Sequence, residues 1–479
     1  MPVFSAALAA AAILLAVAVG LALAVDVRVG VALAFGALLV PLALVDLPAV
    51  IALAVALTVF SRDPAFGLVA TAVGLVMLGG WLAYAREQGA AVRAALRLHR
   101  RVLALVAFLL VWLTLSLAWS QDSSAALSDL VYWYVNAAAI VVLLTSLRTP
   151  RDVRLVFSAF VLAVVTAVCL ALAGIDLGTP QGPDAGALAE GRLQGVIGDP
   201  NFTAAFILVA VVLSAALGAI AAPGTRGLLV PAVVVLVVGL AATQSRGGVL
   251  AALAAFATAV VLIRGRRAAV LGAGAVVLLV GALWFSANPA AVERLQSADE
   301  DRGSGREDIW LVARRLSAEH PIGGVGLANF TLRSREYVRR PGTLEYVELI
   351  VDRPHEVHNT YLQMLAETGA VGLALFLGIV ATAVRSAIRA ARAFERAGER
   401  TLARVSGGVA AATVGLLTAA FFISLQSTAA FWVVLMLGPV LLGVSRRTEV
   451  DARRRTVAQH RPGASFVPVP HTVPSHGRR

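Results

Sequence analysis

Long apolar runs recur along almost the whole of this 479-residue chain, and they constrain its fold more than any other feature. About twenty consecutive apolar residues are enough for a helix to cross the hydrocarbon core of a bilayer. Inside lipid a chain must satisfy its own backbone hydrogen bonds, and runs of this length do so as helices. The sequence therefore predicts an all-α, polytopic integral membrane helical bundle with about 12–14 transmembrane helices. The candidate runs are 4–25, 29–45, 47–60, 66–84, 102–119, 127–147, 155–175, 202–221, 228–242, 249–263, 268–285, 362–384, 405–425 and 429–444, of which the third is short for a full crossing.

The composition agrees with this class and excludes an ordinary soluble protein. Charged residues make up 14% of the chain and hydrophobic residues 59%, whereas about a quarter of the residues in soluble domains are charged. The net charge of +12 comes from arginines in short clusters between apolar runs, which is typical of cytoplasmic loops rather than of a nucleic-acid-binding surface. We therefore expect the membrane, and no nucleic acid, as a partner. The single cysteine, Cys169, excludes an intramolecular disulfide.

The arginine clusters also predict the orientation of the bundle. Short loops keep their basic residues in the cytoplasm, and the clusters at 86–101, 148–154, 264–267 and 385–404 are separated by even numbers of predicted spans. Both termini are then cytoplasmic, and the alternate loops face outside. The predicted organisation is an N-terminal transmembrane bundle (1–287), an extracytoplasmic segment with short amphipathic helices (288–361), C-terminal transmembrane helices (362–444) and a disordered basic cytoplasmic tail (445–479).

Four polar motifs fall on the predicted outer side. They are GRLQGVIGDPN at 191–201, TQSRGG at 243–248, GREDIW at 305–310 and PHEVHNTYLQMLAETGAVG at 354–372. The first three each contain an arginine, and a guanidinium presents a fixed fork of donors that suits phosphate oxygens. Together, these arginines would suit a diphosphate. Each also has a structural interpretation, as a loop charge or as a side chain that reaches to the lipid headgroups; the three are Arg192, Arg246 and Arg306.

The GREDIW motif begins a predicted amphipathic helix. Ser304 and Glu307 have the spacing of a capping box, and apolar residues then recur at helical intervals. We expect a helix over 306–319, ended by His320 and Pro321. The glycine-rich stretch that follows either presents backbone N–H groups to an anion or forms only a turn.

His358 is the predicted proton acceptor. An imidazole at the outer mouth of a helical bundle, beside Asn359, is suited to take a proton from an attacking hydroxyl near neutral pH. The alternative is a structural hydrogen-bonding role. His355, Glu356 and His358 do not have the HExxH spacing of a zinc site, and no set of Cys, His and acidic residues completes a ligand shell. We therefore expect no metal and no cofactor.

In this order the four motifs resemble the signature of the O-antigen ligase and polymerase superfamily of bacterial membrane glycosyltransferases, over residues 192–376. The resemblance implies a GT-C-like helical bundle that takes a glycan from an undecaprenyl-diphosphate-linked donor on the outer face of the bacterial plasma membrane. The implied site residues are His358 as the catalytic base, Arg246, Arg306 and Arg192 at the diphosphate, and Asn359, Asn201, Ser245 and His355 in support, with looser matches for Arg192 and Asn201.

The reaction that the resemblance implies is transfer of the glycan to a hydroxyl on a lipid or glycan acceptor, without a metal ion. The sequence does not separate a ligase from a polymerase. A transporter or flippase of a lipid-linked glycan is an alternative, but its sites would lie near mid-membrane on broken helices. Here the polar residues gather at the predicted outer mouth instead. A peptidoglycan polymerase of the shape and division type is a further alternative, which the HNTYLQ motif disfavours.

Overall fold

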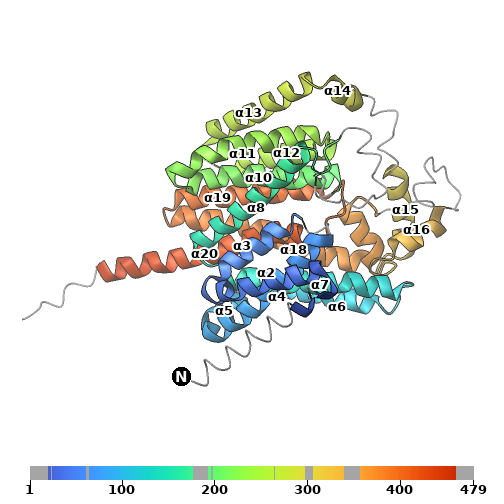
Figure 1. Cartoon of the computed structure of the whole chain (residues 1–479), viewed down its shortest axis with the longest axis horizontal. Coiled ribbons are helices and arrows are strands. Elements are labelled where there is room, and N and C mark those ends of the chain that lie inside the picture. Colours follow the sequence, from blue (N-terminus) through green and yellow to red (C-terminus); the bar gives the residue numbers. More distant parts are fainter. Residues whose placement is uncertain are drawn as a thin grey trace, which may run out of the picture.

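The computed structural model describes residues 20–22, 24–60, 64–175, 192–195, 198–263, 265–296, 306–338 and 356–459, and within these ranges it contains helices and no strand (Figure 1). The predicted all-α polytopic fold is confirmed. The helices are α2 (Val27–Val45), α3 (Leu47–Leu57), α4 (Pro64–Glu87), α5 (Gly89–Leu98), α6 (Arg100–Ser116), α7 (Ser123–Ser146), α8 (Pro150–Leu172), α10 (Pro200–Ile220), α11 (Pro223–Ala242), α12 (Arg246–Leu262), α13 (Arg267–Ser286), α14 (Pro289–Gln296), α15 (Arg306–Glu319), α16 (Phe330–Val338), α18 (Thr360–Arg396), α19 (Arg400–Ala419) and α20 (Ala429–Gln459).

Ten of the described helices are long and apolar enough to cross a membrane, or eleven if α5 and α6, which meet at an angle of 79°, form one span. This is fewer than the 12–14 predicted, for two reasons. The first predicted run, 4–25, lies mostly outside the described residues. In addition, α3 and α12 are apolar but have only 11 and 17 residues, which is shorter than a bilayer crossing normally needs.

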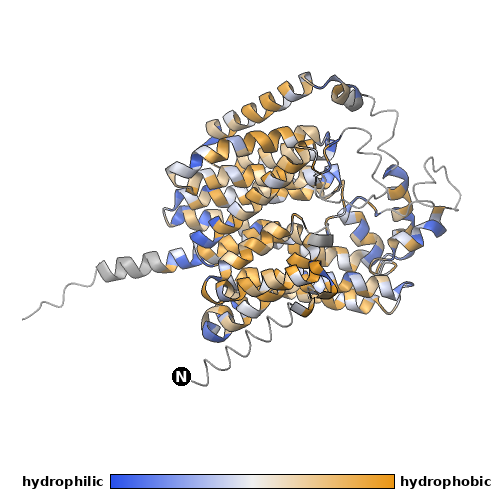
Figure 2. Cartoon of the chain, in the orientation of Figure 1, coloured by the Kyte–Doolittle hydropathy of each residue, from blue (hydrophilic) through white to orange (hydrophobic). Residues whose placement is uncertain are grey.

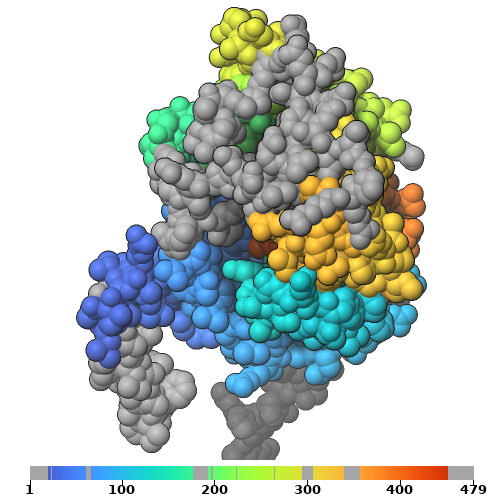
Figure 3. Space-filling view, turned by 90° about the vertical axis from the view of Figure 1, so that its right-hand side faces the viewer, coloured from blue at the N-terminus to red at the C-terminus, as the bar shows by residue number. Residues whose placement is uncertain are grey.

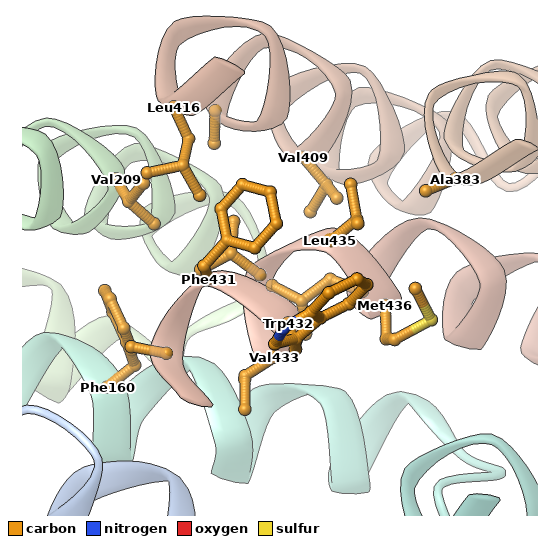
Figure 4. Packing of buried hydrophobic residues seen from close by; sticks show 14 of the residues in the cluster. Phe160, Val209, Ala383, Val409, Leu416, Phe431, Trp432, Val433, Leu435 and Met436 are labelled. Carbon is orange, nitrogen blue, oxygen red and sulfur yellow. The ribbon is translucent and has the colours of Figure 1, made fainter. Parts of the chain in front are cut away.

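The most enclosed part of the bundle is the first half of α20, in which residues 430–442 are all buried. Phe431, Trp432, Leu435 and Met436 of this helix are buried among α8, α10, α18 and α19 (Figure 4). Close approach is possible because small residues line the contact: a Cβ at Gly438 would lie 2.6 Å from the Ala383 carbonyl oxygen of α18. Close packing at small residues is the usual way in which helices associate where lipid provides no hydrophobic driving force.

The opposite extreme is α13, which lies along one edge of the bundle (Figure 1) and has no buried residue. Its sequence is almost entirely apolar. A helix that is apolar all round and unprotected by protein is suited to contact with lipid. The core and the membrane-facing surface therefore differ in packing more than in composition.

Polar residues gather at the two ends of the helices, and the side faces are hydrophobic (Figure 2). One end carries α15, α16 and the beginning of α18, and α20 extends beyond the other end (Figure 1). The helical part of α20 continues to Gln459, so the first part of the tail predicted to be disordered, 445–459, is helical. Arg446 and Glu449 form an ion pair one turn apart there, at 3.0 Å, which favours helix.

Candidate active site

The first motif and the second motif pack against each other. The Leu193 N–H donates to the Ala242 carbonyl at 2.9 Å, and Nε of Arg192 donates to the Thr243 carbonyl at 3.1 Å. The Thr203 hydroxyl, in the first turn of α10, donates to the Gln194 carbonyl. The segment that carries Arg192 is therefore fixed to the end of α11, three residues before Arg246.

Two helix N-termini meet at this position. Asp199 caps α10 by accepting the N–H groups of Asn201 and Phe202, at 2.6 and 2.9 Å. Ser245 caps α12 by accepting the Gly248 N–H at 3.1 Å, and its hydroxyl donates to Oδ1 of Asn201 at 2.7 Å. The predicted supporting residues Asn201 and Ser245 thus join the two helices. Both N-termini carry partial positive charge, which favours an anion nearby.

Arg246 is the first residue of α12, and its side chain is exposed. The two glycines after it are buried for a steric reason. A Cβ at Gly247 would lie 2.9 Å from the Phe422 ring, and one at Gly248 would lie 2.8 Å from Cβ of Ala204. The RGG sequence therefore allows α12 to approach both α10 and the segment between α19 and α20.

On the other side of the site, α18 begins immediately after His358. Asn359 is its N-cap, because Oδ1 accepts the N–H groups of Tyr361 and Leu362 at 3.1 and 3.0 Å. His358 itself is half-buried and adopts a left-handed backbone, with φ of 52°. A non-glycine residue rarely adopts this conformation, and surrounding contacts must hold it there.

The contacts that hold the start of α18 come from the segment between α19 and α20, residues 420–428, which we call the α19–α20 loop. The Thr360 N–H donates to the carbonyls of Ala420 and Ile423, at 2.8 and 3.1 Å. The Thr360 hydroxyl donates to Ile423 and accepts the Leu425 N–H. Since Phe422 of the same loop packs on Gly247, this loop connects the Arg246 motif to the His358 motif.

The predicted helix over 306–319 is confirmed as α15, which ends at Glu319 before His320 and Pro321. Arg306 is its first residue and is half-buried. One turn later, the Trp310 indole donates to the Val357 carbonyl at 3.1 Å, next to His358. Ile309, Val312 and Leu316 pack with Val357 and Ala366 in one buried cluster. The Arg306 and His358 motifs are therefore in direct contact.

The glycine-rich stretch 321–330, which we call the glycine-rich turn, packs against a break in α18 at Gly369, whose φ is 66°. The Val325 and Gly326 N–H groups donate to the Ala366 and Glu367 carbonyls, at 3.0 and 2.9 Å, and the Ala370 N–H donates to the Pro321 carbonyl at 2.8 Å. These donors bond to protein, so they are not available to an anion. Of the two predicted alternatives, the structure favours the turn.

This turn also contacts the end of α6, because the Leu327 N–H donates to the Ser116 hydroxyl at 3.3 Å. Figure 3 shows the yellow and orange part of the chain beside the cyan part. The buried Asn329 side chain accepts the Asp122 N–H at 2.8 Å, and the Trp112 indole donates to the Thr368 carbonyl at 2.8 Å. The break in α18 is therefore supported from two directions.

Backbone strain is concentrated in the motifs. Among the described residues, the non-glycine residues with left-handed φ are Gln244, Ala328 and His358. They fall in the Arg246 motif, in the glycine-rich turn and in the His358 motif. Strained backbone that is held by long-range contacts is a common property of functional sites.

Some predicted features cannot be placed. His355 and Ser304 lie outside the described residues. Within the described ranges, no group of three or more His, Cys, Asp and Glu residues is arranged to hold a metal ion; the absence of a metal remains a prediction. The α19–α20 loop was not predicted as part of the site. Its only signal is the short polar sequence SLQST, which interrupts two apolar runs.

Part of the chain is similar to a known protein family. Residues 231–377 match the family model described as O-Antigen ligase, and the resemblance predicted from the sequence is thereby confirmed. The matched region includes the Arg246, Arg306 and His358 motifs. The Arg192 segment, α10 and the α19–α20 loop lie outside it. No curated protein matches the chain.

Proposed function

We propose that this multi-pass membrane protein, which carries a domain of the O-antigen ligase family at residues 231–377, joins a glycan from an undecaprenyl-diphosphate donor to a hydroxyl acceptor on the outer face of the bacterial plasma membrane. The family match supports a membrane glycan ligase or polymerase. The donor, the acceptor and the orientation are our proposal, together with the roles of individual residues.

The observation that carries the proposal is the contact between motifs that are far apart in the sequence. Arg192 bonds to the backbone of the Arg246 motif, and the α19–α20 loop connects that motif to His358. Two arginines beside two helix N-termini form an environment suited to a diphosphate, because guanidinium groups and N-terminal dipoles both favour negative charge. Arg306, at the start of α15, is the third candidate ligand.

In the proposed reaction, His358 accepts the proton of the acceptor hydroxyl as its oxygen attacks the anomeric carbon of the donor sugar. The bond between that carbon and the diphosphate oxygen breaks, and the diphosphate remains on the polyprenyl carrier. The arginines stabilise the negative charge that develops on the leaving group. Direct attack inverts the configuration at the anomeric carbon. The strained backbone of His358 is consistent with a side chain held in one orientation.

A transporter or flippase is the second candidate, because α18 is a broken helix, and broken helices form the sites of many transporters. The groups freed by this break, however, are bonded to the glycine-rich turn. A break that is filled by protein offers fewer free backbone groups to a substrate. We therefore favour the transferase.

Reconstituted liposomes provide the test. The purified protein is given an undecaprenyl-diphosphate oligosaccharide, and the lipid products are analysed with and without a separate acceptor. A polymerase releases undecaprenyl diphosphate from the donor alone and lengthens the glycan, whereas a ligase requires the acceptor. Movement of labelled donor across the bilayer without release of undecaprenyl diphosphate would instead establish the flippase. A lipid-linked peptidoglycan precursor supplied in parallel tests the peptidoglycan polymerase.

A further inference from the structure

The short helix α5 and the residues on either side of it carry a group of exposed arginines that takes no part in the candidate site. The group consists of Arg86, Arg93, Arg97, Arg100 and Arg101. None of the five forms an ion pair with a described residue. Glu87 is adjacent, but no further acidic residue follows in the sequence until Asp122. The positive charge of this region is therefore not balanced by neighbouring carboxylates along the chain.

The helix α5 lies at the end of the bundle opposite to the candidate site (Figure 1). The next helix, α6, connects the two ends, because the hydroxyl of its last residue, Ser116, accepts the Leu327 N–H of the glycine-rich turn. His99 separates α5 from α6. A Cβ at Gly443 of α20 would lie 3.3 Å from Nε2 of His99, so the junction of α5 and α6 packs where α20 leaves the bundle.

The direction of α5 places it at the surface of the membrane. The preceding helix, α4, is long and apolar enough to cross, and α6 returns to the opposite end at an angle of 79° to α5. A helix between two crossing helices, and nearly perpendicular to one of them, lies close to the membrane plane. The Trp81 indole donates to the Thr145 hydroxyl at 2.8 Å, and the Tyr84 hydroxyl accepts from Arg148 at 2.7 Å. Tryptophan and tyrosine are enriched at the interface between membrane and water, so these residues mark the same level at the end of α4.

The two faces of α5 differ in chemistry. Val92 and Ala95 are buried, and α5 contacts α7. Arg93 and Arg97 are exposed and lie four residues apart, which puts them on one face of the helix. Leu98, beside Arg97, is 40% exposed. Helices that lie in the membrane interface combine basic side chains, which reach the lipid phosphates, with apolar side chains at the boundary of the acyl chains. The exposed face of α5 has both kinds of side chain.

We propose that the exposed face of α5, together with Arg86, Arg100 and Arg101, binds the headgroups of anionic phospholipids in the leaflet where α5 lies. The partner follows from charge and position: clustered arginines attract phosphate groups, and at the level of the membrane surface these belong to lipids. The arginines at the start of α6 add to the partial positive charge of its N-terminus. In the predicted orientation this leaflet is the cytoplasmic one. The proposal is independent of the proposed function, because α5 contributes no residue to the candidate site.

Titration with lipid tests the proposal. The full-length protein in an uncharged detergent receives phosphatidylglycerol, phosphatidylcholine or inorganic phosphate, and the Tm is measured at each concentration. A ligand that binds the folded state raises the Tm as its concentration increases. We expect phosphatidylglycerol to stabilise the wild type at a lower concentration than phosphatidylcholine, and inorganic phosphate to have no comparable effect. Equal stabilisation by the two lipids, or stabilisation by inorganic phosphate as strong as by phosphatidylglycerol, would overturn the proposal.

Substitutions identify the surface that binds the lipid. Arg93→Gln/Arg97→Gln should need about 30-fold more phosphatidylglycerol for the same rise in Tm, since each arginine near an anionic surface contributes a factor of about five. Arg93→Lys/Arg97→Lys keeps the charge and should respond like the wild type. The matched control is Arg314→Gln/Arg335→Gln, which removes two exposed arginines from α15 and α16 at the other end of the bundle and should leave the response unchanged. An equal loss in the control, or no loss in Arg93→Gln/Arg97→Gln, would overturn the proposal.

A second measurement uses lipids that remain bound. The wild type is extracted from bilayers that contain equal amounts of phosphatidylglycerol and phosphatidylcholine, and the retained lipids are quantified by mass spectrometry. Phosphatidylglycerol should be in excess, and the excess should fall in about 0.5 M NaCl, because salt screens attraction at an exposed surface. Should Arg93→Gln/Arg97→Gln fail to fold, Arg86→Gln/Arg101→Gln removes two charges beside α5 and should lower the excess in the same direction. Retention of the two lipids in equal amounts by the wild type would contradict the proposal.

Discussion

The candidate site has two halves that are built in different ways. The arginine half consists of the segment 192–195 and the N-termini of α10 and α12. It is held by side-chain caps and by glycines that permit close helix packing. The histidine half consists of α15, the glycine-rich turn and the start of α18. It is held by backbone pairing between the glycine-rich turn and α18, and by side-chain hydrogen bonds from Ser424 to Gln363 and from Gln363 to Glu367.

This difference suggests that the two halves have different roles in the reaction. Helix N-termini are local structures whose positive ends exist before any ligand binds, so the arginine half is preorganised for an anion. The histidine half depends on long-range contacts that fix a strained His358 and the neighbouring α15. We therefore expect changes in the arginine half to affect mainly donor binding, and changes in the histidine half to affect mainly turnover.

The largest expected effect is in the histidine half. His358→Ala should lower kcat by about two to four orders of magnitude if the imidazole is the general base, and it should leave donor binding nearly intact. His358→Asn separates chemistry from backbone strain, because asparagine tolerates left-handed φ better than most residues. It should be as inactive as His358→Ala but more stable. Glycan transfer and thermal unfolding measure the two effects.

His355→Ala should have a much smaller effect than His358→Ala. If the ranking is reversed, the base has been assigned to the wrong histidine of the motif. If both variants remain active, the proton acceptor lies elsewhere, with Glu356 as the next candidate, or the transferase proposal itself fails.

The next largest effects are expected from lysine substitutions of Arg246, in the arginine half, and Arg306, in the histidine half. Arg246→Lys should raise the donor KM, because a lysine provides a point charge and not the paired donors that bind phosphate oxygens. A loss of one charge-assisted hydrogen bond, about 1.5–3 kcal/mol, corresponds to roughly a 10- to 100-fold weaker interaction. Arg306→Lys should lower kcat as well, because Arg306 belongs to the histidine half. Near-normal turnover by both lysine variants would mean that these residues only anchor helices.

Local patterns in the sequence predicted some parts of the site and not others. The bounds of α15 follow from its apolar periodicity and from the His320–Pro321 stop, so 306–319 was predicted correctly. The contact of Arg192 with Thr243 depends on which loops meet in space, which periodicity does not encode. The α19–α20 loop carries no recognisable motif, and its role follows from two tertiary contacts, the packing of Phe422 on Gly247 and the hydrogen bonds of the loop with Thr360.

The left-handed backbone of His358 could not be predicted from the sequence either. Histidine carries no strong turn signal, and the nearby Thr360 is held by residues 420–425, about sixty positions away in the sequence. The glycine-rich turn was recognised, but its partner was not: the fit between Gly324 and the break at Gly369 is a tertiary contact. The four motifs, whose order along the chain resembles the family signature, were informative because they contact one another in the folded protein.

A smaller effect tests the connection between the halves. Gly247→Ala places a methyl group 2.9 Å from the Phe422 ring, and such overpacking costs about 1–3 kcal/mol. The α19–α20 loop should shift. Because this loop contacts both halves, we expect weaker donor binding and a lower kcat. The double variant Gly247→Ala/Phe422→Ala should recover part of the activity, because it removes the ring but keeps Cβ of residue 422, which would lie 3.0 Å from the new methyl group. The expected coupling energy is about 0.5–3 kcal/mol.

The control for this pair is Gly272→Ala on α13, where a Cβ would meet nothing within 4 Å. It should be neutral or slightly stabilising, because alanine favours helix over glycine by about 1 kcal/mol. If Phe422→Ala does not relieve the defect of Gly247→Ala, the two halves are not connected through this contact.

The smallest effects should come from the N-caps, and the residue that restores each cap should differ between the halves. Ser245→Ala and Asn359→Ala should each cost about 0.5–2 kcal/mol of stability. Asn359→Asp should restore α18, because a carboxylate still accepts the N–H groups of Tyr361 and Leu362 and interacts favourably with the helix dipole. Ser245→Thr should restore α12, since a hydroxyl is needed both to accept from Gly248 and to donate to Asn201. Thermal unfolding in detergent measures these differences. If Ser245→Ala is as stable as the wild type, the bond between Ser245 and Asn201 does not hold the arginine half together, and the preorganisation that we assign to this half must come from the glycine packing alone.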